Sequence, residues 1–584
     1  MSNPLIDDRV VDLLLSHVVD VDGLLSLPRY AEHTRETFDL YLGACRRVAR
    51  EVLLPTYSIT DREGPTFEDG RVLLHPEMKR AIAQLTELGI VSATRPEAVG
   101  GAQLPHTVAS LAHAYLMAGN LSATGVLGLT AGAAHLIEAF GDERVKRLFM
   151  EPMYDGRWTG TMALTEPQAG SSLGDLTTKA TPHDDGTYRI DGAKIFISGG
   201  DHDAAENIVH LVLARIEGAP AGTRGISLFA VPKRRPTDDG LVDNDVAVSG
   251  MIHKIGWRAL PSLALAFGSE GDCVGWLVGE PHRGLRCMFQ MMNEARLMVG
   301  VNAIATASVA YHESLAYARE RTQGRPLGVR DTDSPPVSLI SHPDVRRMLL
   351  RQKAIVDGSL CLAAVTARYA DLAGGGDHAA QLMLDLLTPV TKSFPAEHGF
   401  ESNVLSVQIH GGYGYSSEYR PEAWMRDQKL NSIHEGTTGI QSLDLLGRKV
   451  VAKGGAAWMG LAQAVTADLA AFDLEMEAEA LTDALNRVGA LVATLGQRGL
   501  TGDLEGMLGH SADFLELFSV LVVGWMHVKL DNAAQRNAPD SDLARGLRQG
   551  ARYWFATELP RVAPLVARCE SAERSYLDME DAWF

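Results

Sequence analysis

The sequence predicts an α+β fold in which a small β domain stands between helical regions. Apolar residues recur every three or four positions up to about residue 155, a spacing typical of amphipathic helices. From about residue 156 to 275 the pattern changes to short apolar runs separated by Gly, Asp and Pro turns, which indicates strands. From about residue 282 the helical spacing returns and continues to the end of the chain. Helices, then a small sheet, then further helices are typical of α+β proteins.

The same periodicity places the individual elements. In the first part it predicts helices over Arg35–Val52, Glu77–Leu88, Thr107–Ala118, Val126–Phe140 and Arg144–Phe149. In the middle part it predicts strands over Trp158–Leu164, Tyr188–Ile190, Lys194–Ser198, Ile208–Ala214 and Ser227–Val231. We therefore expect four domains, over residues 1–155, 156–280, 281–453 and 454–584.

Composition narrows the class of protein. A chain of 584 residues with 46% hydrophobic and 22% charged residues is typical of a globular protein with several domains. The net charge of −19 argues against binding of nucleic acid or of an anionic membrane through a basic face. The five cysteines are scattered without a C-x-x-C pair, so we expect neither a metal site nor a disulfide framework.

Neither an export signal nor a membrane span is expected. The residues that follow Met1 contain no basic stretch and no apolar stretch of the kind found in signal peptides. The longest apolar run, Leu515–Leu530, is interrupted by Glu516, His527 and Lys529, and it is too short to cross a bilayer. We therefore expect a cytoplasmic protein.

A loop after the first predicted strand has the chemistry of a ligand site. In Thr165–Ser172, Pro167 stiffens the backbone, and Gly170 lets the main chain approach a ligand closely. Its N–H groups and hydroxyls suit a planar ring with carbonyl edges. The run Gly170–Gly174 also fits the G-x-S-x-G motif of α/β-hydrolases, but that motif needs a sharp strand–turn–helix, and this loop leads to another strand. A plain surface loop is the other interpretation.

Glu435 is the candidate catalytic base. It lies in the run Asn431–Gln441, where a glycine and threonines follow it and isoleucines flank it. Such neighbours would desolvate the carboxylate and raise its pKa, which makes a stronger base toward a weakly acidic C–H group. A solvated surface glutamate is the alternative. An H-E-x-x-H zinc motif is excluded because Thr438 stands at its last position, and neither a dinucleotide-binding motif after a strand nor a Walker A motif occurs.

Three stretches, in this order, resemble the acyl-CoA dehydrogenase flavoenzymes: Met162–Ser172, Gln408–Tyr415 and Asn431–Gln441. Four further stretches are similar to segments of that family: Lys194–Gly199, His253–Ala259, Asn293–Leu297 and Glu320–Leu327. The helices beyond residue 454 and the leader before Tyr30 resemble a longer subgroup that acts on fatty acyl-CoA or methylmercaptopropionyl-CoA. The resemblance implies a helical domain, a small β-barrel or sheet domain, a C-terminal four-helix bundle and a helical extension.

The resemblance implies FAD as the cofactor and assigns residues to it. One set would hold the edge of the isoalloxazine ring: Met162, Leu164, Thr165, Gly170 and Ser171. A second set would lie along the other side of the ring: Phe196, Ile197 and Ser198. Thr437 and Gly439 would reach the cofactor after the base. A last set would bind the pyrophosphate and adenosine of FAD in the other subunit of a homodimer: Arg321, Gln408, Gly411 and Gly412.

The implied reaction is the dehydrogenation of an acyl-CoA thioester to the trans-2-enoyl-CoA. The residues implied near the substrate are Ser171, Asn293, Arg296 and Gly436. The N–H of Glu435 would bind the thioester carbonyl while the Glu435 carboxylate takes the α-proton and the β-hydrogen leaves as hydride to the flavin. An electron-transfer flavoprotein would then accept the electrons. The alternatives are an acyl-CoA oxidase that uses O2 and a non-catalytic flavoprotein on the same fold.

The chain departs from the family pattern at several positions: Gln168, Ser172, Gly199, Gly324 and Pro343. Some relatives carry the base directly before the arginine that corresponds to Arg296, but here Ala295 stands there. Glu294 is one step further back and is expected to point elsewhere on its helix. The small residues of Ala118–Gly125 fit either a roomy acyl pocket or close helix packing.

Overall fold

The computed structural model describes residues 3–331 and 333–584, with the side chains of residues 289–293 outside the description. The chain divides into two compact units. The helical unit comprises residues 1–36, 105–114 and 296–584, and the sheet unit comprises residues 37–104 and 115–295. The first is built almost entirely from helices, and the second contains the strands of the main sheet.

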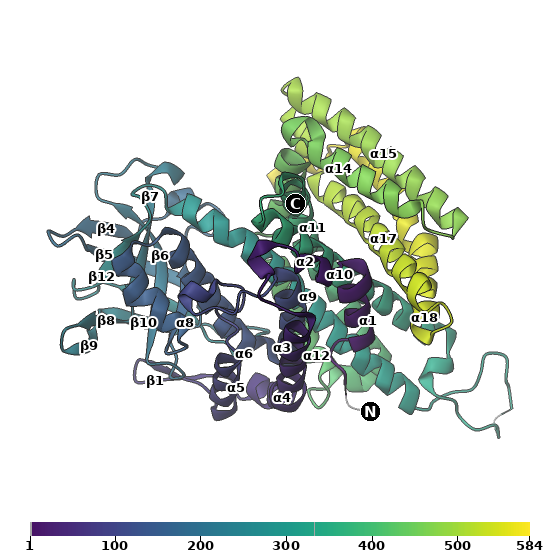
Figure 1. Ribbon diagram of the computed structural model, residues 1–584, viewed down its shortest axis with the longest axis horizontal. Helices are drawn as coiled ribbons and strands as arrows, with labels where there is room; N and C mark the ends of the chain where they lie inside the picture. Colours follow the sequence, from purple (N-terminus) through teal and green to yellow (C-terminus); the bar gives the residue numbers. More distant parts are fainter. Residues whose placement is uncertain (1–2, 332) are drawn as a thin grey trace. The chain divides into compact units, whose positions relative to one another are not determined.

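The sheet unit is organised around one eight-stranded sheet (Figure 1). The strand order is β10-β11-β5-β12-β7-β6-β3, and β4 pairs with both β5 and β6. The strands are β3 (Trp158–Ala163), β4 (Lys179–Pro182), β5 (Tyr188–Ser198), β6 (Asn207–Ile216), β7 (Ile226–Pro232), β10 (Val246–Met251), β11 (Ser262–Phe267) and β12 (Val274–Val278). Two short hairpins join β1 (Thr66–Glu68) to β2 (Arg71–Leu73) and β8 (Arg234–Thr237) to β9 (Gly240–Asp243).

Both faces of the main sheet are covered, as alternate residues of β6 show. Val209, Leu211 and Leu213 lie in one buried apolar cluster together with helix residues such as Phe149. Val212 and Ala214 lie in a second cluster on the opposite face. Because successive side chains of a strand point to opposite faces, the continuous apolar run of β6 is what a central strand requires.

The helices of the sheet unit begin with α3 (Arg35–Val48), which continues through a π-helical turn into α4 (Leu54–Arg62). They continue with α5 (Pro76–Glu87), α6 (His106–Phe140, from Tyr115 onward), α7 (Glu143–Val145) and α8 (Glu151–Tyr154). Within α6, Asn120 leaves helical geometry, with φ −157° and ψ 98°. Its side-chain oxygen accepts a hydrogen bond from the N–H of Ala123 at 3.2 Å and so caps the second half of the helix. This break lies between the two helices that the sequence predicted.

The small residues of this helix serve close packing. A Cβ on Gly119 would lie 2.8 Å from the carbonyl oxygen of Ala49, and a Cβ on Gly125 would lie 3.0 Å from the ring of Trp257. A Cβ at these distances would force a neighbouring atom to shift, which favours glycine at both positions. These contacts fit the close-packing alternative at both positions.

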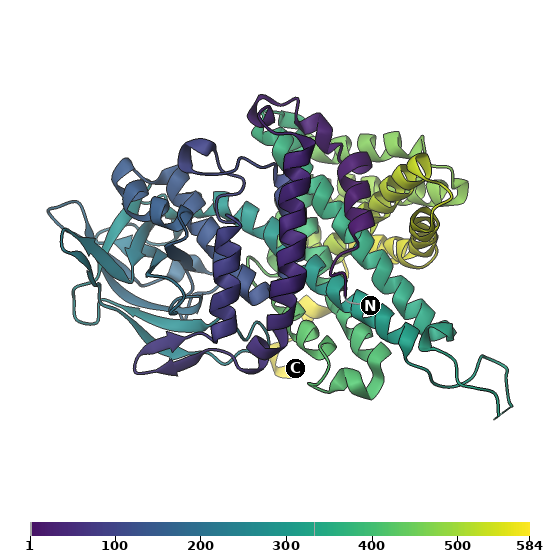
Figure 2. The same ribbon diagram turned by 60° about the horizontal axis from the view of Figure 1, so that its bottom comes forward.

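The helical unit contains a bundle and an extension packed on it (Figure 1). The bundle comprises α9 (Gly284–Glu320, from Arg296 onward), α10 (Pro343–Gly374), α11 (His378–His410), α12 (Pro421–Lys429) and α13 (Thr438–Asp444). Either side of residue 332, the chain between α9 and α10 projects away from these helices, and Thr322 pairs with Ser338 at its base (Figure 2). Two short leader helices precede the bundle, α1 (Asp8–Leu13) and α2 (Val21–Leu24).

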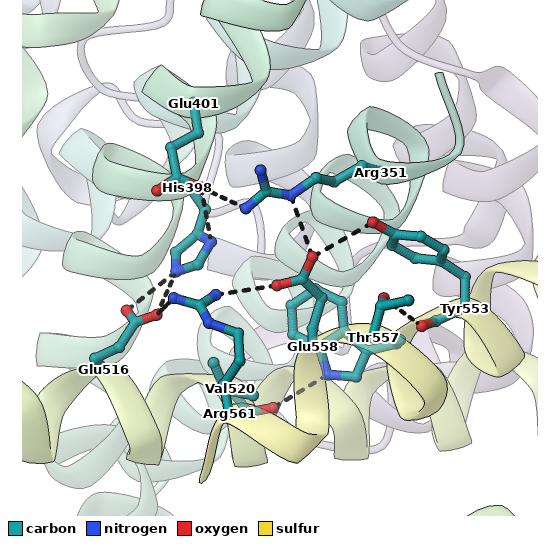
Figure 3. A network of polar contacts seen from close by, with 10 residues as sticks. Arg351, His398, Glu401, Glu516, Val520, Tyr553, Thr557, Glu558 and Arg561 are labelled. Carbon is teal, nitrogen blue, oxygen red and sulfur yellow. Dashed lines mark hydrogen bonds and ion pairs between the residues drawn. The ribbon is translucent and has the colours of Figure 1, made fainter. Parts of the chain in front are cut away.

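The extension packs on the bundle mainly through α17. Its helices are α14 (Ala452–Leu469), α15 (Glu475–Leu500), α16 (Leu504–Leu508), α17 (Ser511–Asn537), α18 (Asp542–Tyr553), α19 (Val562–Ser571) and α20 (Ser575–Asp578). A network of ion pairs crosses the interface (Figure 3). In it, Arg351 of α10 bonds to Glu558 at 3.1 Å, and His398 of α11 bonds to Glu516 of α17. The extension is therefore held by both apolar and ionic contacts.

Two helices have the length and hydropathy of a membrane span, His106–Phe140 and Leu504–Asn537. In each helix, more than half of the most apolar 18-residue stretch is buried within the protein (56% and 61%). Core helices of globular proteins have the same character. The apolar run Leu515–Leu530 lies within α17. Among the described residues, no group of three or more His, Cys, Asp and Glu side chains could hold a metal ion.

Candidate active site

The loop after β3 is held in place by a buried carboxylate. Glu166 accepts hydrogen bonds from the N–H groups of Thr177 at 2.7 Å and Thr178 at 3.0 Å, and from both of their hydroxyls. The Lys194 ammonium of β5 lies 2.8 Å from Glu166, and both side chains are buried. Burial would raise the pKa of Glu166, but the bonds from Lys194 and Thr178 outweigh it and lower that pKa far below its usual range.

This arrangement brings the loop beside the end of β5. The N–H of Ile195 donates to the carbonyl oxygen of Thr165 at 2.9 Å. Gly170 and Ser171 are exposed on the loop, whereas Met162, Leu164 and Thr165 are half-buried. After Ser172 the chain makes only a short 3-10 turn before β4, so the strand–turn–helix of a hydrolase elbow does not form in this described loop.

Phe196 is displayed in an unusual way at the end of β5. Leu263 of β11 pairs with Ile197 and Leu265 pairs with Lys194, so β5 carries one extra residue here, as in a β-bulge. At the bulge Phe196 has φ 62° and its side chain is 60% exposed. A left-handed aromatic residue costs about 1–3 kcal/mol and is typical of ligand sites. Ile197 points into the core, so only its main chain can reach a ligand, and Ser198 is half-buried.

In the helical unit, Glu435 occupies a turn of left-handed backbone. Glu435 has φ 55° and Gly436 has φ 90°. Thr437 then caps α13 by accepting from the N–H of Ile440 at 3.4 Å, which ends the turn. The side chain of Gln441 donates to the carbonyl oxygen of Glu435 at 3.0 Å and fixes its backbone. A Cβ on Gly436 would lie 2.8 Å from that Gln441 amide. This short contact and the positive φ both favour glycine at this position.

The environment of Glu435 tunes it as a base. Burial raises the pKa of the Glu435 carboxyl, and the charges of Arg296 and Lys392 act in the opposite direction. Arg296 is itself buried and forms an ion pair with Asp444 at 2.8 Å. Its guanidinium is thus paired with protein, while the side chain of Asn293 lies outside the described residues.

Glu294, the other carboxylate considered from the sequence, belongs to the sheet unit. Its carboxylate lies 3.2 Å from Nδ1 of His135 on α6. The opposite nitrogen of His135 lies 3.1 Å from the carbonyl oxygen of Val91. Glu294 is therefore engaged in a local contact with α6.

A third group gathers at the end of α9 and α11. The guanidinium of Arg321 lies 5.8 Å from the ring centre of Tyr413, directly after the Gly411-Gly412 pair. Gln408, Gly411 and Gly412 are exposed, and a Cβ on either glycine would meet open space. The group combines a cation, open backbone and aromatic surface, which suits a phosphate-bearing ligand.

Thr437 and Gly439 are exposed beside the base at the start of α13. The sequence analysis missed four residues that support the site, namely Lys194, Glu166, Lys392 and Asp444. Two of them, Lys194 and Lys392, are lysines within apolar stretches of β5 and α11. A lysine in such a stretch is the sequence signal that could have marked them as buried, functional residues. A lysine is almost never fully buried unless it is paired.

Four family models match consecutive parts of this chain. They describe the acyl-CoA dehydrogenase N-terminal domain (residues 36–157), its middle domain (161–269), its C-terminal domain (282–450) and an acetyl-CoA dehydrogenase C-terminal-like domain (457–580). Together these matches cover most of the chain.

Similar proteins include two curated relatives. The 3-methylmercaptopropionyl-CoA dehydrogenase of Ruegeria pomeroyi is 38% identical, over 92% of this chain and 92% of the relative. The broad-specificity linear acyl-CoA dehydrogenase of Mycobacterium tuberculosis is 35% identical, over 89% and 88%. A solved acyl-CoA dehydrogenase from Bacillus anthracis, complexed with FAD, has the same fold, with TM-score 0.76 and 20% identity over 97% of this chain and 93% of that one. This chain belongs to the acyl-CoA dehydrogenase family.

Proposed function

We propose that this protein is an FAD-dependent acyl-CoA dehydrogenase that converts an acyl-CoA thioester to the trans-2-enoyl-CoA, with Glu435 as the general base. The observation that carries the proposal is the Glu435 turn. There a carboxylate with a raised pKa stands on a backbone fixed by Gln441, in a chain matched by the family along most of its length. A desolvated, fixed carboxylate is suited to removing a weakly acidic α-proton.

The residues of each unit fit FAD as the cofactor. In the sheet unit, the exposed ring of Phe196 and the open loop at Gly170 and Ser171 offer apolar and hydrogen-bonding surface for an isoalloxazine ring. In the helical unit, Arg321 and the Gln408–Gly412 loop offer a cation and open backbone for the pyrophosphate and adenosine. When bound, FAD supplies the hydride acceptor.

The family resemblance suggests the roles of the remaining residues. Glu435 takes the α-proton on its side-chain carboxylate, and its N–H, held by the fixed backbone, donates to the thioester carbonyl. Gly436 keeps the turn open beside the base. Ser171 contacts both the cofactor and the substrate, and Asn293 contacts the substrate. Arg296 is a substrate-side residue that acts through its ion pair with Asp444.

Partners and compartment complete the proposal. The enzyme is a cytoplasmic homodimer or higher homo-oligomer, and Arg321 with Gln408, Gly411 and Gly412 serves the FAD of the neighbouring subunit. The exposed tyrosines Tyr413 and Tyr415 beside them support this, since exposed aromatic residues are frequent in interfaces. An electron-transfer flavoprotein takes the electrons, and acyl-CoA is the substrate.

The test is anaerobic mixing of the purified protein with acyl-CoA thioesters of graded chain length and with methylmercaptopropionyl-CoA. The protein should be yellow, carry one non-covalent FAD per chain and lose its flavin absorbance with at least one thioester. A colourless protein that cannot be reconstituted with FAD would overturn the proposal. Oxygen uptake as fast as reduction of an electron-transfer flavoprotein would identify an oxidase, and absence of bleaching by every thioester would identify a non-catalytic flavoprotein.

A further inference from the structure

Lys392 is a buried cation with no bonded partner in the described part of the chain. It lies in the middle of α11, its side chain is 0% exposed, and its Nζ has no hydrogen-bond partner among the described residues. An unpaired buried ammonium is costly, because burial penalises the charged form. Lysines are almost never fully buried without a partner, so a reason for this one is needed.

The packing of α9 against α11 places Lys392 near Arg296. A Cβ on Gly300 of α9 would lie 2.2 Å from the carbonyl oxygen of Thr391, so the two helices touch at the residue directly before Lys392. Arg296 lies four positions before Gly300, on the same face of α9. The ion pair of Arg296 with Asp444 at 2.8 Å then joins this part of α9 to the end of α13.

A second contact ties α11 to the start of α13. The hydroxyl of Thr438 donates to the carboxylate of Glu397, which lies five residues after Lys392 on α11. Thr438 is three residues after Glu435. The contact at the start of α13 therefore holds the Glu435 turn beside α11, and the pair of Asp444 with Arg296 holds the end of α13 to α9.

The charges around Lys392 agree with this placement. Burial lowers the pKa of Lys392 to about 8, while Glu397 and Glu435 act to raise it and Arg296 to lower it. The ammonium is thus still mostly protonated at neutral pH. Glu397 is bonded by Thr438 and lies 4.0 Å from Lys429, and Arg296 is paired with Asp444. Of Arg296, Lys429 and Lys392, Lys392 is the cation that has no hydrogen-bond or ion-pair partner among the described residues.

We propose that Lys392 is a positioning residue for Glu435, and that its buried ammonium keeps the Glu435 carboxylate ionised at neutral pH. Lys392 does not touch the reacting atoms. The inference rests on the proposed role of Glu435 as the base and adds the group that keeps this base in its working form.

The consequence is a specific change in pH dependence. Without the ammonium, desolvation of Glu435 is opposed by Arg296 alone, whose charge is already balanced by Asp444. The acid limb, meaning the fall in the flavin-reduction rate as the pH is lowered, should move to higher pH by about 1–3 units. This is the usual effect of one close opposite charge on a pKa. Above the new pKa the carboxylate forms and the rate recovers. A purely structural defect would instead lower the rate at every pH.

The experiment compares Lys392→Met with wild type by anaerobic stopped-flow bleaching of the full-length holoenzyme across pH. Lys392→Gln, which keeps a polar end without the charge, is measured in parallel, and Lys392→Arg should restore the acid limb toward wild type. Lys353→Met is the matched control, since Lys353 is a largely buried lysine of α10 that is paired with Asp357 at 2.5 Å. It should leave the acid limb in place.

A second measurement tests the same pair of residues without requiring enzyme activity. A double-mutant cycle of Lys392→Met and Glu435→Gln on thermal unfolding should show that the two changes are coupled rather than additive. The inference would be overturned if Lys392→Met and Lys392→Gln contain FAD and keep the wild-type pH dependence of flavin reduction at acid pH. Additive effects of the two changes in the double-mutant cycle would overturn it as well. If Glu435→Gln alone still bleaches at the wild-type rate, the proposed function of Glu435 fails instead, and the cycle still measures the pair.

Discussion

Nε2 of His398 on α11 lies 3.0 Å from the carboxylate of Glu516 on α17, and this partly buried ion pair joins the extension to the bundle (Figure 3). Burial would lower the pKa of His398, but Glu516 outweighs it and raises that pKa. Burial would raise the pKa of Glu516, but His398 and Arg561 outweigh it and lower that pKa. The charged form of each partner is favoured by folding.

His398→Gln should therefore lower stability in a pH-dependent way. The folded pKa of His398 is raised, so its contribution is complete below the unfolded pKa and is lost as the pH rises through the folded pKa. Loss of a hydrogen-bonded charge here should cost about 1–3 kcal/mol. The thermal midpoint difference from wild type should be larger at about pH 5.5 than at about pH 8.5, on either side of the ordinary histidine pKa of about 6.5.

The control for this prediction is His527→Gln on α17, the helix that carries Glu516. Burial lowers the pKa of His527 to about 3, so its folded form is neutral and wild-type stability falls as the pH drops below the unfolded pKa. The difference in thermal midpoint between wild type and variant should therefore change with pH in opposite directions for the two variants. Equal slopes for both would contradict the ion-pair assignment of His398.

The succession of helical and sheet parts could be predicted because long periodic segments carry a strong signal. The α+β organisation with a helical extension is confirmed. The expected strands Tyr188–Ile190 and Lys194–Ser198 form one strand, β5. The two hairpins and the strands β4, β10, β11 and β12 were missed, because most are short and several are half-exposed. Their pairing is set by tertiary contacts rather than by local pattern.

The candidate site was predictable as motifs and not as contacts. The sequence marks Glu435 through its glycine and threonine neighbours, and the left-handed backbone at Glu435 fits that pattern. It does not reveal that Arg296 pairs with Asp444, 148 residues away, or that Lys194 pairs with Glu166. Such pairs join elements that only the folded chain brings together. The site assignments themselves stay predictions.

Lys194→Met should destabilise the loop after β3. It leaves the buried Glu166 carboxylate without its cation, and breaking a buried ion pair typically costs about 3–5 kcal/mol. Because Glu166→Gln removes the orphaned charge, the double variant should be less destabilised than the sum of the single variants, as measured by thermal unfolding. Arg235→Met is the control, since its pair with the exposed Asp272 lies at the surface of the same unit and such pairs contribute about 0–1 kcal/mol. Additive losses would contradict the pairing.

Arg321→Ala should weaken FAD retention much more than it disturbs folding. A planar guanidinium donates paired hydrogen bonds to phosphate oxygens, and alanine cannot replace them. The measurement is the FAD content after dialysis, together with the circular dichroism and oligomeric state of the variant. Arg330→Ala, at an exposed position on the loop that projects between α9 and α10, is the control and should retain FAD. Unchanged FAD affinity in Arg321→Ala would refute its cofactor role.

Glu435→Gln should leave folding, FAD content and acyl-CoA binding intact, yet nearly abolish flavin reduction. The amide keeps the size and the main-chain donor but cannot accept the α-proton, and loss of a general base costs about 10²–10⁴-fold in rate. Burial raises the folded pKa of Glu435, so wild-type stability falls as the pH rises past the unfolded pKa of about 4.3. The glutamine variant escapes this loss and should be at least as stable as wild type at neutral pH.

The measurement is anaerobic stopped-flow bleaching with a thioester that reduces the wild-type flavin. Glu294→Gln is the matched control, because Glu294 is a half-buried carboxylate on α9 that bonds to His135. It should bleach at a rate close to wild type. If instead Glu435→Gln reduces its flavin normally and Glu294→Gln does not, the base is Glu294, since the remaining difference between the two variants is which carboxylate can accept the proton.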